Sequence, residues 1–268
     1  MMFLQYSIWA AWYVTMGRYL GGTLNIPADK IGLAYNSTAL AAMISPFFVG
    51  MVADRFFSTE RILAVLHILG GVLMFLLAQA TTFATFYPLL IAHTLCYMPT
   101  LALTNSISFH LMQDPGKEFP RIRVLGTISW IITVWAVGQF SPLDVTTPLP
   151  FMIAGGASLL MGVYCLTLPH TPPTPTGKPV TVRDVLGLDA LALMKERSFL
   201  VFVISAFLIC IPLAFYFAFA PQSLGDMDMP NATQKTVLGQ ISEIFFMVVM
   251  PWFFLRLGVK YMLVVGMF

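Results

Sequence analysis

Long apolar runs alternate with short polar breaks along most of the chain. A helix needs about 20 apolar residues to cross the hydrocarbon core of a bilayer. Runs of about that length lie near residues 2–24, 31–53, 62–82, 84–110, 122–141, 148–168, 198–221 and 236–256. A further run starts near 260 and continues to 268. We therefore predict an all-α polytopic membrane protein with about eight membrane-spanning helices and the start of a ninth.

The positions of the basic residues predict how these helices are oriented. Lys and Arg in short loops mark the cytoplasmic side of a membrane. Of the 14 basic residues, only Arg18, Lys30 and Lys235 fall on the side opposite to the others, which follow the even-numbered runs. The start of the chain and the polar segment 169–198 are therefore predicted to be cytoplasmic.

Segment 169–198 is the one long polar interruption, and it suggests a division of the chain. We predict an N-terminal six-helix bundle over 1–168, a cytoplasmic linker with an amphipathic helix over 169–198, and an incomplete C-terminal bundle over 199–268. The helix could lie in the membrane interface or be a solvated linker helix. Its apolar face would be formed by Val185, Leu186, Leu188, Leu191, Leu193 and Met194.

The composition supports a membrane protein and excludes several other classes. Hydrophobic residues make up 58% of the chain and charged residues 10%, whereas soluble domains carry about 25% charged residues. Lipid must therefore be the solvent for most of the surface. The net charge of +2 is small and the basic residues form no stripe, so nucleic acid is not an expected partner.

The usual signatures of enzymes and metal sites are missing from the sequence. It contains no HExxH, no GxSxG and no paired carboxylate motif, so we do not expect an enzyme. Cys96, Cys165 and Cys210 are far apart in separate apolar runs. His67 and His93 have no ligand partner one turn away. We therefore expect neither a metal nor a cofactor.

A short motif lies between the second and third runs, in the string GMVADRFFSTER. It consists of Gly50, Asp54, Arg55 and Arg61. The glycine would allow two helices to approach closely, and the aspartate can pair with a basic residue or cap a helix. The motif resembles the GxxxDRxxxRR-type signature of the major facilitator superfamily, which implies a gating or structural role for this loop.

The expected second copy of that loop follows the eighth run, in PWFFLRLGVKYM. It keeps Arg256, Gly258 and Lys260 but has no acidic residue. Six runs before a cytoplasmic linker also match the six-helix halves of this superfamily. The loop motif after the second run and the six runs before the linker thus support the same fold independently.

Within the superfamily, the chain resembles the nucleoside:proton symporters over almost its whole length. The resemblance rests on WAAWYVTMGRYL, YMPTLALTNSISF, PRIRVLGTISW, GQISE and LGLDALAL, in that order except that the last string lies in the linker. It implies proton-coupled uptake of nucleosides by alternating access, in a bacterial inner membrane. It also implies that the chain is a truncated sequence that does not transport by itself, and that a cytoplasmic segment before Met1 is missing.

Polar and ionisable residues inside the runs are costly in lipid and are candidates for function. Arg123, Thr127 and Trp130 lie at i, i+4 and i+7 on one helix face, and Gln240 and Glu243 lie at i and i+3 on another. The resemblance places the substrate pocket here. It implies that Trp130 packs on the ligand ring, that the other four contact the ligand, and that Glu243 also takes the proton.

Several alternatives remain open. Arg123 could be an ordinary arginine at the cytoplasmic end of a helix, and Glu243 could belong to a structural buried pair, perhaps with Arg123. In the first run, Gln5, Trp9 and Trp12 could line the cavity or be ordinary interface residues.

The chain also departs from the family pattern. Leu213 and Tyr216 stand where characterised nucleoside symporters show Gln and Asn, and Trp130 stands for a phenylalanine. Because of these changes, the substrate could instead be another polar solute such as a sugar. A drug-type antiporter is a further alternative, although the run VLGTISWIITVWAVG contains no proline and so lacks the Gly/Pro-rich signature of that class.

Overall fold

The structure is a computed structural model, and its described part consists of helices and their connections without a β-strand. It describes residues 1–55, 57–140, 147–172, 190–227, 229, 235 and 237–267. The helices are α1 (Met2–Tyr13), α2 (Met16–Gly22), α3 (Ala28–Arg55), α4 (Thr59–Leu77), α5 (Phe83–Leu111), α6 (Pro115–Phe140), α7 (Leu149–Cys165), the 3-10 helix η1 (Ala190–Lys195), α9 (Arg197–Asp226) and α11 (Val237–Met267). A helix therefore occupies each apolar run that the sequence analysis identified.

The first run differs from its prediction because it contains two helices. Between α1 and α2, the Thr15 hydroxyl donates to the backbone oxygens of Ala11 and Trp12, at 3.3 and 3.2 Å. A threonine that bonds back to the preceding turn competes with the backbone ladder and often bends a helix. The interruption at Val14 and Thr15 follows from this local chemistry, which hydropathy does not record.

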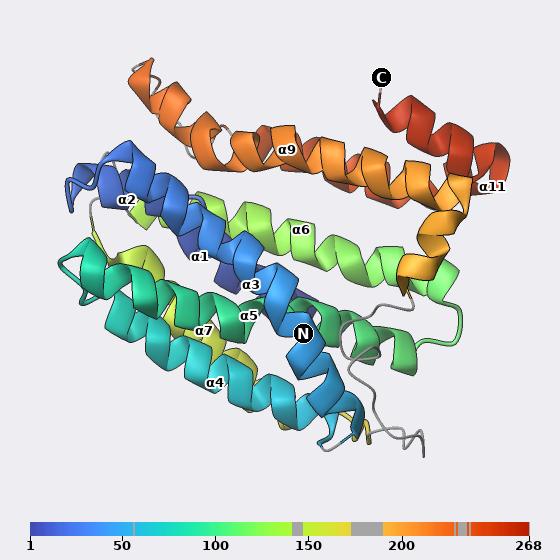
Figure 1. Cartoon of the computed structure of the whole chain (residues 1–268), viewed down its shortest axis with the longest axis horizontal. Helices are drawn as coiled ribbons and strands as arrows, with labels where there is room; N and C mark the ends of the chain where they lie inside the picture. The colour runs from blue at the N-terminus through green and yellow to red at the C-terminus, as the bar shows by residue number, and fades with distance from the viewer. Residues whose placement is uncertain are drawn as a thin grey trace.

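The long helices run side by side in two groups around α6 (Figure 1). On one side, α4 packs against α5 and α7, α3 packs against α5, and α1 packs against both α6 and α7. On the other side, α11 packs along α6, and α9 touches α2. Helix α6 thus lies between the first group of helices and the last two.

Most of the buried apolar residues belong to the first group of helices. Trp12, Phe86, Tyr97 and Phe151 are among the largest fully buried side chains. By contrast, α9 and α11 expose most of their apolar side chains. In the described chain, five helices are long and apolar enough to cross a membrane, and α7 is apolar but shorter.

Helix α11 is interrupted near the end of the chain. Gly258 adopts φ 67° and ψ 171°, a conformation that residues with a Cβ rarely adopt. The helix changes direction there, and the following residues form the short run predicted from residue 260 onward.

Two sequence predictions lie largely outside the described residues. Val185, Leu186 and Leu188 of the predicted linker helix are not described, whereas Leu193 and Met194 belong to η1. The amphipathic linker helix and the division into two bundles therefore stay predictions.

The loop motif is also described only in part. Gly50, Asp54 and Arg55 lie in the last turns of α3, but their side chains are outside the described part. Arg61 is exposed in the first turn of α4. The gating or structural role of this motif is still a prediction.

A buried carboxylate joins the start of α4 to the segment that follows α7. One oxygen of Glu60 accepts a bond from His170 Nδ1 at 2.8 Å, and the other accepts from the amide and hydroxyl of Thr171 at 3.1 and 2.8 Å. The Thr59 backbone amide also donates to the Thr171 backbone oxygen at 3.2 Å. Residues 59–60 and 170–171 therefore lie on the same face of the protein.

Replacing this carboxylate is expected to destabilise the fold. Glu60→Ala leaves the buried Thr171 donors without an acceptor, and a lost buried hydrogen bond costs about 1–3 kcal/mol. For a protein of this size, we expect the melting temperature in detergent to fall by several degrees, at about 2–4 °C per kcal/mol. Glu196→Ala is the matched control because the Glu196 side chain is exposed. Equal melting temperatures for the two variants would contradict a structural role for Glu60.

Candidate functional site

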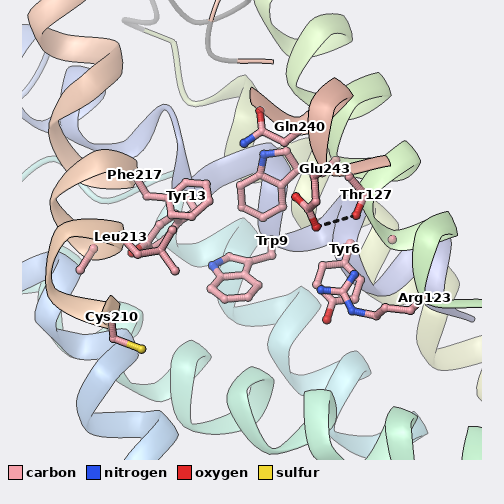
Figure 2. A pocket seen from close by; sticks show the side chains of 13 residues that line it. Tyr6, Trp9, Tyr13, Arg123, Thr127, Cys210, Leu213, Phe217, Gln240 and Glu243 are labelled. Atoms are coloured by element: carbon pink, nitrogen blue, oxygen red, sulfur yellow. Dashed lines mark hydrogen bonds between the residues drawn. The ribbon is translucent and has the colours of Figure 1, made fainter. Parts of the chain in front are cut away.

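A cavity of about 530 Å³ lies among α1, α6, α9 and α11 (Figure 2). This volume is in the range of sites for small molecules. Its lining consists of Tyr6, Trp9, Tyr13, Arg123, Gly126, Thr127, Trp130, Cys210, Leu213, Ala214, Phe217, Gln240 and Glu243. The five candidate binding residues from the sequence analysis all lie in this one cavity.

The charged and amide groups of the cavity come from α6 and α11, and α1 adds the hydroxyls of Tyr6 and Tyr13. The Thr127 hydroxyl donates to Glu243 Oε1 at 3.0 Å, and Thr127 is buried. Gln240 is 8% exposed, and its Oε1 has no hydrogen-bond partner in the described chain. A buried acceptor without a partner is costly. A ligand that donates a hydrogen bond at this point would remove that cost.

The charged groups of the cavity do not pair with each other. The Arg123 guanidinium carbon lies 4.2 Å from the centroid of the Tyr6 ring, which is a cation–π distance. The described residues contain no ion pair between Arg123 and Glu243 within 4.0 Å. The alternative of a structural pair between them is therefore not the arrangement seen here.

Aromatic side chains form a second wall of the cavity. The rings of Trp9 and Trp130 meet edge to face with centroids 5.8 Å apart, and Trp130 meets Phe217 at 5.7 Å. Trp9 also contacts Tyr13 at 5.6 Å. Such rings offer a flat apolar surface on which another ring can stack.

Helix α9 contributes a predominantly apolar surface. Cys210, Leu213, Ala214 and Phe217 line the cavity from this helix. Leu213 was identified in the sequence as a departure from the family pattern, and the structure places it in the lining. Tyr216 is absent from the lining, and its ring packs against Phe217 at 5.4 Å.

The buried histidines and two of the first-run candidates belong to the core instead. Gln5 and Trp12 are fully buried, so of the three residues considered in the first run only Trp9 lines the cavity. His67 Nε2 lies 3.0 Å from Gln5 Oε1, and His93 Nδ1 lies 3.0 Å from a backbone oxygen of α4. Both rings thus serve hydrogen bonds between packed helices.

Sequence reasoning missed several residues of the lining, above all Tyr6, Tyr13 and Phe217. A signal for the first two was present. Tyr6, Trp9 and Tyr13 are spaced by three and four residues, which places them on one face of a helix. The same spacing links Cys210, Leu213, Ala214 and Phe217 on α9. Apolar stripes of this kind also face lipid or core, so spacing alone did not single them out.

Comparison with known proteins places the chain in a family. The family model described as nucleoside H+ symporter matches residues 1–268. The chain belongs to the nucleoside H+ symporter family. The family resemblance seen in the sequence is thereby confirmed, and the chain is one of a family of membrane transporters.

Individual relatives agree with this placement. The chain is 47% identical over 272 residues to the putative nucleoside transporter YegT of Escherichia coli, covering 100% of the chain and 64% of that protein. It is 31% identical over 281 residues to the xanthosine permease of the same organism, covering 100% of the chain and 67% of that protein. The chain thus spans only about two-thirds of the length of these relatives.

A solved structure confirms the fold. The crystal structure of the nucleoside transporter NupG, as its D323A mutant, matches with a TM-score of 0.85 and 31% identity. The match covers 97% of this chain and 68% of that one. The chain has the major facilitator superfamily fold predicted from its sequence, and it is a multi-pass membrane protein.

Proposed function

We propose that the protein containing this chain takes up nucleosides together with protons by alternating access, and that it is not an enzyme. The observation that carries this proposal is the cavity, which places a cation, a carboxylate and an amide beside a flat aromatic wall. A nucleoside has matching parts, because its ribose and base edges form hydrogen bonds and its base is a flat ring. Family membership supports the same activity.

The lining suggests how the nucleoside would lie. Its hydroxyl groups would face Thr127, Gln240 and Glu243, where the unpartnered Gln240 oxygen can accept a hydrogen bond. Arg123 would donate to ligand oxygens from the same side. The base would pack on Trp130. This orientation uses each of the five residues predicted from the sequence.

Glu243 is the proposed site of proton coupling. Its carboxylate lines the cavity and accepts one bond from Thr127, so the same group can contact the ligand and bind the proton. When one group serves both, binding of each partner changes the affinity for the other. Alternating access of two halves would then carry both across the membrane.

The proposed setting is the bacterial inner membrane, with lipid as the surrounding partner and no nucleic acid. The start of the chain and residues 169–198 would face the cytoplasm. Residues 169–198 would link a six-helix bundle formed by 1–168 to an incomplete bundle formed by 199–268. The contacts of Glu60 with Thr171 support one part of this proposal, since they place the first turn of α4 and the start of the linker on the same side.

Uptake of labelled uridine and adenosine tests the proposed function. The complete reading frame would be expressed in cells that lack their own nucleoside carriers, with and without a protonophore. We expect uptake of at least one nucleoside and a strong decrease when the protonophore is present. Protein that reaches the membrane and takes up no nucleoside would contradict the proposal and would favour another polar solute, such as a sugar.

A further inference from the structure

Arg123 and Glu243 carry opposite charges in the same cavity, yet they point to different partners (Figure 2). The guanidinium lies over the Tyr6 ring, and the carboxylate accepts a bond from Thr127. Opposite charges in a cavity of low dielectric attract each other strongly. Some feature of the lining must therefore hold the arginine in its place.

The ring of Tyr6 lies where it can hold the Arg123 guanidinium, and a glycine in α6 leaves space for this ring. Gly126 lies on α6 between Arg123 and Thr127. A Cβ atom at Gly126 would lie 2.6 Å from Tyr6 Cδ2 and 2.9 Å from Arg123 Nη1. Real side chains do not approach that closely, so the glycine is what allows the ring and the guanidinium to meet here.

The backbone on one side of Tyr6 is fixed by Gln5. The Gln5 amide donates to Thr100 Oγ1 at 2.7 Å, and its oxygen lies 3.0 Å from His67 Nε2. The Tyr97 hydroxyl donates to the Gln5 backbone oxygen. These contacts come from α4 and α5, so Gln5 joins α1 to two other helices.

On the other side of Tyr6, Ser7 joins α1 to α6. The Ser7 and Ser129 hydroxyls lie 2.6 Å apart, and Ser129 donates to the Phe3 backbone oxygen. Tyr6, which is half-buried, is thus placed between two buried neighbours that are hydrogen-bonded to other helices. These contacts fix the backbone from which the Tyr6 ring extends toward Arg123.

We propose that Tyr6 is a positioning residue whose ring holds Arg123 apart from Glu243. The ligand then meets an unpaired cation, and the carboxylate remains available for a proton. This inference rests on the proposed function, in which both charged groups serve the nucleoside and its coupling.

The position of Arg123 also affects the pH dependence of uptake in this proposal. Besides Glu243, the titratable or charged groups that line the cavity are Tyr6 and Tyr13 of α1, Arg123 of α6 and Cys210 of α9. Arg123 is the one cation among these described groups. If it moved to Glu243, it would pair with the group that is proposed to bind the proton, and proton-coupled uptake would change.

Two substitutions at Tyr6 test the proposal in the complete protein. Tyr6→Leu removes the ring, whereas Tyr6→Phe keeps the ring and removes only the hydroxyl. For Tyr6→Leu, we expect the KM for uridine to rise about tenfold, within the range of a cation–π contact, and the pH profile of uptake to change. For Tyr6→Phe, we expect a much smaller change in both quantities, because the hydroxyl contact with Arg123 is lost but the ring contact remains. A Leu variant with unchanged KM and pH profile, or a Phe variant as impaired as the Leu variant, would overturn the proposal.

A structure of Tyr6→Leu provides a readout that does not depend on the substrate. We expect the Arg123 guanidinium to lie within about 4 Å of the Glu243 carboxylate, the distance of an ion pair. An arginine that stays in its wild-type position would overturn the inference whether or not nucleosides are transported. A wild-type protein that takes up no nucleoside, together with the moved arginine in the variant, would instead contradict only the proposed function.

Discussion

Replacing Glu243 by glutamine is expected to abolish proton-driven accumulation of nucleosides. The glutamine keeps the shape of the side chain and can still accept the bond from Thr127, but it cannot bind and release a proton. We expect accumulation of uridine under an imposed pH gradient to fall to less than about one-tenth of the wild-type level. Exchange of external for internal uridine, which needs no net proton movement, should continue.

The matched control for this variant is Glu196→Gln, which makes the same chemical change at an exposed position before α9. It should accumulate uridine as the wild type does. If Glu243→Gln still responds to the pH gradient, the proton is carried elsewhere, and Glu243 is at most a ligand contact.

Replacing Arg123 by glutamine is expected to weaken nucleoside binding. A hydrogen bond from a charged group contributes about 1.5–3 kcal/mol, so we expect the KM to rise by about 10- to 100-fold. The maximal rate should change less, because the group is proposed to act in binding. Initial rates of uridine uptake at a series of concentrations separate the two quantities.

Arg121 provides the control for this second variant. It lies two residues earlier on α6, so it points to another helix face, and its side chain is exposed. Arg121→Gln should leave the KM unchanged. Equal effects of the two substitutions would assign Arg123 to the alternative role of an ordinary arginine at the helix end.

The helices were predictable because lipid imposes a simple requirement on sequence. A spanning helix must be long and apolar, so runs such as 84–110 and 198–221 already locate α5 and α9. The break between α1 and α2 was not predictable in this way, because it depends on the bonding of the Thr15 hydroxyl.

The polar half of the site was predictable for a related physical reason. Charged side chains such as Arg123 and Glu243 are costly in lipid, so they stand out from an apolar run. The aromatic half was not predictable, because Tyr13 or Phe217 could equally face lipid, core or cavity. The role of Gln5 was not predictable either. This polar residue was a candidate for the cavity, but in the structure it is buried and joins helices by hydrogen bonds.

The most direct test of the central claim is a structure of the complete protein with uridine bound. We expect the nucleoside to lie in the cavity of Figure 2, with its base on Trp130 and its ribose beside Thr127, Gln240 and Glu243. Uridine bound at another place, with this cavity occupied by side chains or left without the ligand, would contradict the account.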